Sequence, residues 1–140
     1  MKLVLDASII LKLVRTENEE DQQIALDILK AFQDNKIDIL LPNFWVFEIG
    51  NALVTRNVEN FVTLYDFLLT VEFPTYTFKS GELISIGELA KEYKVSFYDA
   101  SYHYLARLTS STLVTADEKY FEKVKDIGNI RLLKDLELPD

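Results

Sequence analysis

The chain of 140 residues contains no cysteine and only one histidine, His103. The absence of cysteine excludes disulfides, thiolate zinc sites and cysteine nucleophiles, and it fits a reducing cytoplasm. With one histidine, a ribonuclease mechanism that needs a histidine pair is unavailable. A Ser–His–Asp hydrolase is excluded as well, since no G-x-S-x-G motif is present to expose a nucleophile. We interpret His103 as a packing or surface residue rather than a ligand.

Nucleotide-binding and zinc-protease signatures are also missing, because the sequence has no P-loop, no G-x-G-x-x-G and no H-E-x-x-H. Long hydrophobic runs are missing too, and even the segment LYDFLLTVEF includes Asp66 and Glu72. The N-terminal stretch is interrupted by Asp6 and Lys12 and lacks a small-residue cleavage site, so it does not fit a signal peptide. We expect a soluble, cytoplasmic protein with no membrane partner.

Glycine and proline are scarce, with four and three residues, while 49% of the chain is hydrophobic. Such a composition is typical of a compact globular protein rather than a disordered one. The length suits one domain, and there are no repeats, low-complexity tracts or linkers. We therefore expect a single domain over residues 1–140.

Short apolar runs alternate with segments in which apolar residues recur at helical spacing. The runs predict strands at residues 3–5, 37–41, 73–78, 112–115 and 130–133. Strands that alternate with helices pair in parallel and carry helices on both faces, so the expected fold is α/β.

Several residues predict where helices begin. Thr16 with Glu19 forms a capping-box pattern before the first long helix. Ser80 precedes a helix that ends near Tyr93, and Pro42 can occupy the first turn of the helix after the second strand.

Four carboxylates stand where an apolar run ends or a helix begins: Asp6, Glu48, Asp99 and Asp117. A carboxylate near a core is costly to bury as an anion unless a hydrogen bond or a metal compensates it. Ligands of parallel sheets bind beyond the carboxyl ends of the strands, and in this topology all four acids can converge there. Taken singly, Asp6 could open a turn, and Asp99 and Asp117 could be helix N-caps.

Carboxylates from separate elements suit Mg²⁺ or Mn²⁺, which prefer oxygen ligands and keep several waters. Such a site can activate water and stabilise the charge that develops on a phosphate, with one ion or two. The pattern therefore predicts metal-dependent phosphodiester hydrolysis and no other cofactor.

Four polar residues near the acids are candidate supporting groups. Ser8 and Thr115 each lie two residues from an Asp and can hold a ligand or a metal-bound water. Asn51 can support the Glu one turn earlier by hydrogen bonding. Lys12, with Arg15, could contact phosphate. The alternatives stay open: Ser8 could start a helix, Thr115 could be an ordinary strand residue, and the two cations could be solvated surface charges.

The net charge of −8 disfavours non-specific binding of nucleic acid over the whole surface, because such binding neutralises phosphates with Lys and Arg. A polyanionic substrate must then be attracted by a local basic patch or by the metal itself.

The segments LVLDASIILKLV, P-x5-EIGNAL, YDASYHYLA and LVTADEKYF, in this order, resemble PIN-domain ribonucleases, especially the VapC-type toxins of toxin–antitoxin pairs. The resemblance implies an α/β/α sandwich around a central, mainly parallel sheet, and cleavage of RNA with Mg²⁺ or Mn²⁺. The four acids match the acidic positions of the family, Ser8 and Thr115 match hydroxyl positions, and Asn51 matches the Asn after the Glu. It further implies a homodimer and a small antitoxin partner.

Residues 57–79 carry no signature of the family. In the family this region and the preceding helix commonly form dimer or antitoxin surfaces. The aromatic residues Phe61, Tyr65, Phe67 and Phe73 could serve such a surface, although packing in a helical core is the default expectation.

Two other functions remain open. A PIN-fold module could act mainly in regulatory assembly with an antitoxin and have little or no nuclease activity. A receiver or haloacid-dehalogenase type of phosphoryl-transfer protein also places an Asp after its first strand, but Ser8 stands where the phosphatase would have a second acid.

Overall fold

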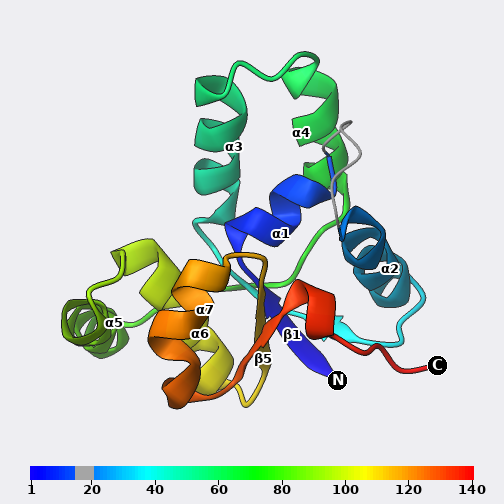
Figure 1. The fold of residues 1–140 in the computed structure, drawn as a ribbon. Helices are drawn as coiled ribbons and strands as arrows, with labels where there is room; N and C mark the ends of the chain where they lie inside the picture. The colour runs from blue at the N-terminus through cyan, green and yellow to red at the C-terminus, as the bar shows by residue number, and fades with distance from the viewer. Residues whose placement is uncertain (15–20) are drawn as a thin grey trace.

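The structure, a computed structural model, describes residues 1–14 and 21–140. Its centre is a parallel sheet of four strands in the order β2-β1-β5-β6 (Figure 1). The strands are β1 (Lys2–Leu5), β2 (Asp38–Ile39), β5 (Thr112–Thr115) and β6 (Ile130–Leu132). Leu3 pairs with Ile39 on one side and with Thr112 on the other. The parallel arrangement confirms the α/β expectation.

Seven helices and two 3₁₀ turns connect the strands within the described residues. The helices are α1 (Ala7–Lys12), α2 (Gln22–Gln33), α3 (Trp45–Thr55), α4 (Phe61–Thr70), α5 (Ser80–Tyr93), α6 (Phe97–Leu108) and α7 (Glu118–Val124). The 3₁₀ turns cover Lys125–Ile127 and Leu133–Asp135. None of these helices is both long enough and apolar enough to cross a bilayer.

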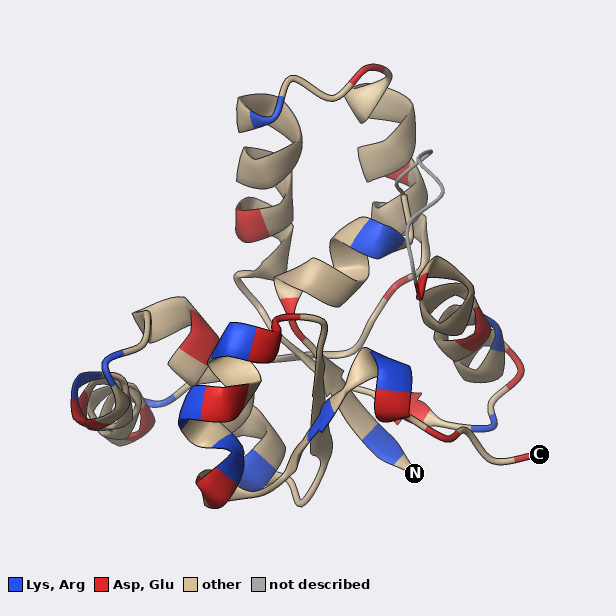
Figure 2. Ribbon diagram, in the orientation of Figure 1, with Lys and Arg blue, Asp and Glu red and all other residues tan. Residues whose placement is uncertain are grey.

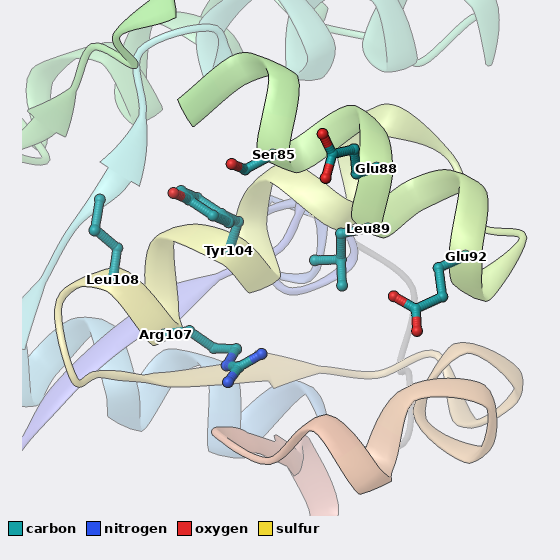
Figure 3. A pocket seen from close by; sticks show the side chains of 7 residues that line it. All are labelled: Ser85, Glu88, Leu89, Glu92, Tyr104, Arg107 and Leu108. Atoms are coloured by element: carbon teal, nitrogen blue, oxygen red, sulfur yellow. The ribbon is translucent and has the colours of Figure 1, made fainter. Parts of the chain in front are cut away.

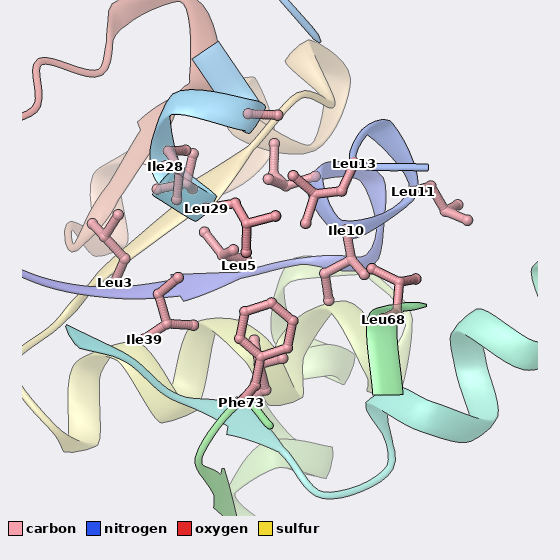
Figure 4. Close-up of a cluster of buried hydrophobic side chains, with 14 of the residues drawn as sticks. Leu3, Leu5, Ile10, Leu11, Leu13, Ile28, Leu29, Ile39, Leu68 and Phe73 are labelled. Atoms are coloured by element: carbon pink, nitrogen blue, oxygen red, sulfur yellow. The ribbon is translucent and has the colours of Figure 1, made fainter. Parts of the chain in front are cut away.

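Side chains of the central strands alternate between two cores, one on each face of the sheet. Leu3 and Leu5 belong to the larger cluster, which includes residues of α1 to α4, whereas Val4 belongs to the cluster under α6 and α7. Figure 4 shows the larger cluster, in which Ile28 of α2 and Phe73 lie near these strand residues. Because successive strand side chains point to opposite faces, a sheet that is apolar on both faces is covered by helices on both. The fold is thus the expected α/β/α sandwich.

The predicted strand at residues 37–41 is divided between two sheets. Leu40 N donates to Leu3 O at 3.0 Å, while Leu41 N donates to Pro74 O at 3.0 Å. The chain thereby leaves the central sheet and forms β3 (Leu41–Pro42), which pairs in parallel with β4 (Thr75–Tyr76). The run at 73–78 accordingly forms only the two-residue β4.

The helix starts agree with the sequence in part. Helix α5 ends at Tyr93 as predicted, but Ser80 is its first residue rather than the residue before it. The N-cap is Lys79, whose N donates to Glu82 Oε1 at 2.9 Å. The prediction for Pro42 is wrong, since Pro42 lies in β3 and α3 begins only at Trp45. Proline is tolerated there because the residues on either side of it donate the hydrogen bonds to the β4 segment. The predicted capping box of residues 16 and 19 lies outside the described residues.

The aromatic residues of the middle segment divide between core and surface. Phe73 is buried and packs edge-on against Trp45, with ring centroids 5.6 Å apart. The Tyr65 hydroxyl donates to the carbonyl of Val46 and so links α4 to α3. Phe61 and Phe67 are 41% and 43% exposed. The expectation of core packing therefore holds for Phe73 and Tyr65 but not for the other two.

Candidate metal centre

Asp6 lies at the carboxyl end of β1, where it caps α1. Its Oδ1 accepts hydrogen bonds from Ser8 N at 3.0 Å and from Ile9 N at 3.3 Å. Asp6 N donates to Val114 O at 3.3 Å, which fixes the residue beside the end of β5. The carboxylate is buried, at 8% exposure. Asp6 thus combines the role of a cap with that of a buried acid in the position where parallel sheets bind ligands.

The environment of Asp6 opposes ionisation. Burial is the main cause that raises its pKa, from 3.8 to about 6. Hydrogen bonds from Ser8 and Thr115 lower it, and the negative charge of Asp99 raises it further. A buried carboxylate with a raised pKa and a like charge nearby is typical of functional sites.

Glu48 lies in the first turn of α3 and points toward α6. Its Oε1 accepts a hydrogen bond of 2.7 Å from the Tyr102 hydroxyl. Burial raises the pKa of Glu48, the hydrogen bond from Tyr102 lowers it, and the charge of Asp99 raises it. Glu48 is therefore close enough to Asp99 for the two anions to affect each other.

Asp99 and Asp117 stand at the starts of α6 and α7. Ser96, not Asp99, is the N-cap of α6, and its Oγ accepts from Asp99 N at 3.0 Å. Asp117 is the N-cap of α7, with Oδ1 accepting from Tyr120 N at 2.9 Å. Burial raises the pKa of Asp99, the bond from Ser96 lowers it, and the charge of Asp117 raises it. The charge of Asp117 therefore acts on Asp99, and the charge of Asp99 acts in turn on Asp6 and Glu48.

Ser8 and Thr115 connect the two loops that carry Asp6 and Asp117. Ser8 Oγ donates to Asp6 Oδ1 and accepts from Ala116 N at 3.2 Å. Thr115 Oγ1 accepts from Asp117 N at 3.1 Å, and its side chain also bonds Asp6. Through these hydrogen bonds the two hydroxyls link the loop of Asp6 to that of Asp117.

Asn51 does not support Glu48 as proposed from the sequence. Its side chain is exposed, and no hydrogen bond joins it to Glu48 within the described structure. The partner of Glu48 is Tyr102 instead, because α6 packs against the start of α3 and places the phenol within reach. Lys12 lies in the last turn of α1, and residue 15 is outside the described part of the chain.

The sequence predicted no role at the site for Tyr102 of α6, whereas it indicated a packing or surface role for His103 of the same helix. Tyr102 lies three residues after Asp99, so both project from the same side of the helix, and this spacing was a usable signal. His103 is buried as interpreted: its Nε2 lies 2.7 Å from Gly128 O and its Nδ1 lies 3.1 Å from the Tyr120 hydroxyl. Burial lowers the pKa of His103. Because Gly128 O can only accept, the neutral ring carries its proton on Nε2.

The donor set fits a hard divalent cation. It consists of carboxylates. Burial is the main cause that raises the pKa values of Asp6, Glu48 and Asp99, and repulsion from a neighbouring acid raises each of them further. A divalent ion would compensate these charges, and oxygen ligands are those that Mg²⁺ and Mn²⁺ prefer. Among residues 1–14 and 21–140, no group of three Asp, Glu or His side chains has the geometry needed to hold a metal ion.

A separate cavity of about 390 Å³ lies between α5 and α6 (Figure 3). It is lined by Ser85, Glu88, Leu89, Glu92, Tyr104, Arg107 and Leu108. None of the four acids contributes to it, because the lining residues of α6 face α5 whereas Asp99 and Tyr102 face the sheet. The candidate centre is therefore at the end of the sheet and not in this cavity.

Comparison with known families gives a match to the PIN domain model over residues 3–127, a range that includes all four acids. The chain belongs to the PIN domain family. PIN domains are generally nucleases, and these nucleases generally use divalent metal ions. A search of curated proteins found no match.

Solved structures share the fold of this PIN domain. PAE2754 from Pyrobaculum aerophilum is 22% identical with a TM-score of 0.68, and the match covers 96% of this chain and 90% of that one. FitAB bound to the IR36 DNA fragment is 17% identical with a TM-score of 0.60, covering 99% of each chain. FitAcB from Neisseria gonorrhoeae is 18% identical with a TM-score of 0.57, covering 96% and 99%.

Proposed function

We propose that this PIN domain is a Mg²⁺- or Mn²⁺-dependent endoribonuclease and the toxin component of a type II toxin–antitoxin pair. One observation carries the proposal: Asp6, buried at the end of β1, is coupled to Asp99, which is coupled in turn to Glu48 and Asp117. Asp99 thus repels acids from three other elements, and a divalent cation, which prefers carboxylate ligands, would relieve this repulsion.

In this proposal the four acids hold one or two ions. A bound ion would supply a nucleophile from water and stabilise the charge on the scissile phosphate. Ser8 and Thr115 orient Asp6, and Tyr102 orients Glu48, through the hydrogen bonds that reach each carboxylate. Lys12, on α1, is the proposed contact to a substrate phosphate.

Charge on the molecule is distributed unevenly. Figure 2 shows basic and acidic positions interspersed on α5 and α7, with few charges on α3 and α4. Lys12 provides a basic position on α1, the helix that begins at Asp6. With a net charge of −8, attraction of RNA would depend on such local cations and on the metal.

The α3–α4 hairpin supports the proposed antitoxin partner. Within the two helices only Glu48 and Asp66 are charged. Large apolar side chains are exposed along both helices, at Phe47, Val54, Phe61, Val62, Phe67 and Leu69. Exposed apolar surface of this kind marks interaction sites, and an amphipathic helix of an antitoxin would cover it. One similar structure is of FitAB bound to DNA, and a DNA-binding antitoxin is the partner proposed here, together with a homodimer.

The Asp6→Asn variant tests the nuclease. We expect it to fold and to lose metal-dependent RNA cleavage by at least about a hundredfold, since removal of one charged ligand weakens both ion binding and charge stabilisation. Cleavage of RNA by the purified protein is measured with Mg²⁺, with Mn²⁺ and with EDTA. Asp38→Asn, at an exposed acid of β2, is the matched control and should stay active. Full activity of Asp6→Asn would contradict the mechanism.

A regulatory binding module without nuclease activity is the second candidate. Its support is the acidic net charge and the absence, in the described residues, of a preformed arrangement of three metal ligands. Chelation separates the two functions. The nuclease loses RNA cleavage in EDTA and regains it with Mn²⁺, whereas the module leaves RNA intact in both conditions and still binds its antitoxin.

A further inference from the structure

Two aromatic side chains are exposed at the start of α6, directly before Asp99. Phe97 is 42% exposed and Tyr98 is 53% exposed. An exposed aromatic ring offers a large, rigid face on which another aromatic group can stack. The two rings differ in what holds them and in which direction they project.

Tyr98 is held beside the acids by an aromatic cluster. The ring of Phe44, at the start of α3, lies 5.1 Å from the ring of Tyr98 at 67°. The same Phe44 ring lies 5.6 Å from Tyr102, whose hydroxyl donates to Glu48 Oε1 at 2.7 Å. Tyr98 is thus anchored on one side by Phe44, while about half of its surface stays open to solvent.

Helix geometry separates Tyr98 from Phe97. Residues advance by about 100° around a helix, so Tyr98 shares its side of α6 with Tyr102, one turn later. Phe97 is rotated about 200° from Asp99 and projects to the opposite side. Tyr98 therefore lies at the rim of the candidate centre, whereas the adjacent and similarly exposed Phe97 does not.

We propose that Tyr98 is a stacking platform for an unpaired base of RNA next to the phosphodiester that is cleaved. The proposal rests on the proposed function and adds to it a residue that binds the substrate beside the cleaved bond. Aromatic rings bind bases through their faces, and the bases of single strands are free to be splayed onto them, whereas those of a duplex are already stacked. Stacking needs no positive charge, so it suits a protein whose net charge is −8.

Binding of a labelled single-stranded RNA in EDTA, where cleavage is absent, tests the platform by fluorescence anisotropy. We expect Tyr98→Ala to bind roughly 5- to 100-fold more weakly than wild type. Tyr98→Phe keeps the ring and should restore binding, and the matched control Phe97→Ala should bind as wild type does. A fluorescent adenine analogue in the RNA should be quenched by wild type and not by Tyr98→Ala.

Three results would overturn the platform: equal binding of single-stranded RNA by Tyr98→Ala and wild type, an equal loss in Phe97→Ala, or the same dependence on Tyr98 with duplex RNA. Failure of the proposed function gives a different pattern. If wild type cleaves RNA and Tyr98→Ala binds and cleaves equally well, only the platform is wrong. If wild type binds single-stranded RNA through Tyr98 but never cleaves it with Mg²⁺ or Mn²⁺, only the nuclease assignment is wrong.

Discussion

Asp6 serves two purposes whose effects on stability oppose each other. As the N-cap of α1 it accepts backbone hydrogen bonds from Ser8 and Ile9, which stabilise the helix start. As a buried anion near Asp99 it destabilises the folded state without a cation. A bound cation, as proposed above, would offset this cost and leave the capping hydrogen bonds in place.

The pH dependence of unfolding follows from this pKa. The folded-state pKa of Asp6 is raised to about 6 from 3.8, so the folded state holds its proton to higher pH than the unfolded state does. Protonation of Asp6 therefore contributes roughly 2–3 kcal/mol to the free energy of unfolding. This contribution is complete below about pH 4 and is lost as the pH rises through about 6. Without metal, Asp6→Asn should therefore be more stable than wild type at neutral pH and equal to it near pH 4.

Urea unfolding in EDTA at the two pH values measures this difference. Asp38→Asn, which changes an exposed acid, is the control and should show no such gain. A loss of stability in Asp6→Asn at neutral pH would mean that the ionised carboxylate stabilises the fold.

At the scale of elements, the helix starts position the acids. α1 and α7 begin directly after the candidate ligands Asp6 and Asp117, and α6 begins two residues before Asp99. Side-chain caps hold these starts at Asp6, Ser96 and Asp117. The positions of Asp6 and Asp117 beside strand ends and helix starts could be predicted because these are local patterns. The partner of Glu48 could not be predicted in this way, since Tyr102 reaches it across 54 residues of sequence.

Ser96→Ala tests the cap of α6. We expect it to lower the free energy of unfolding by about 0.5–2 kcal/mol, because Asp99 N loses its acceptor at a helix start. Chemical denaturation measures the change. Ser80→Ala is the matched control: Ser80 is the first residue of α5, whose start is held by Glu82 instead, so its loss should be smaller. Equal losses in both variants would mean that the Ser96 bond adds no stability of its own.

At the scale of the molecule, the sandwich brings acids from distant segments to one edge of the sheet. The three acids with raised pKa values come from β1–α1, α3 and α6, and Asp99 raises the pKa values of both Asp6 and Glu48. Repulsion among them is a property of the folded chain alone. Binding of a divalent ion should thus stabilise the whole molecule.

Thermal unfolding with Mn²⁺ and with EDTA measures that stabilisation. At a free ion concentration one hundred times the Kd, wild type should gain about 2.7 kcal/mol and a correspondingly higher Tm. Asp99→Asn should gain much less, because it removes the acid that faces two others. A Tm increase of the same size in Asp99→Asn would place the ion elsewhere.

The sequence by itself determined the α/β order, the extent of β5 and, to within one residue, the extents of β1 and β6, because strand periodicity is recorded in neighbouring residues. Only the tertiary structure decided the contacts between distant segments. The approach of α6 to the start of α3 gave Glu48 its partner Tyr102 and brought Tyr98 against Phe44, and the bend at Leu40 divided one predicted strand between two sheets. Such contacts depend on how whole elements pack, and no local pattern encodes that.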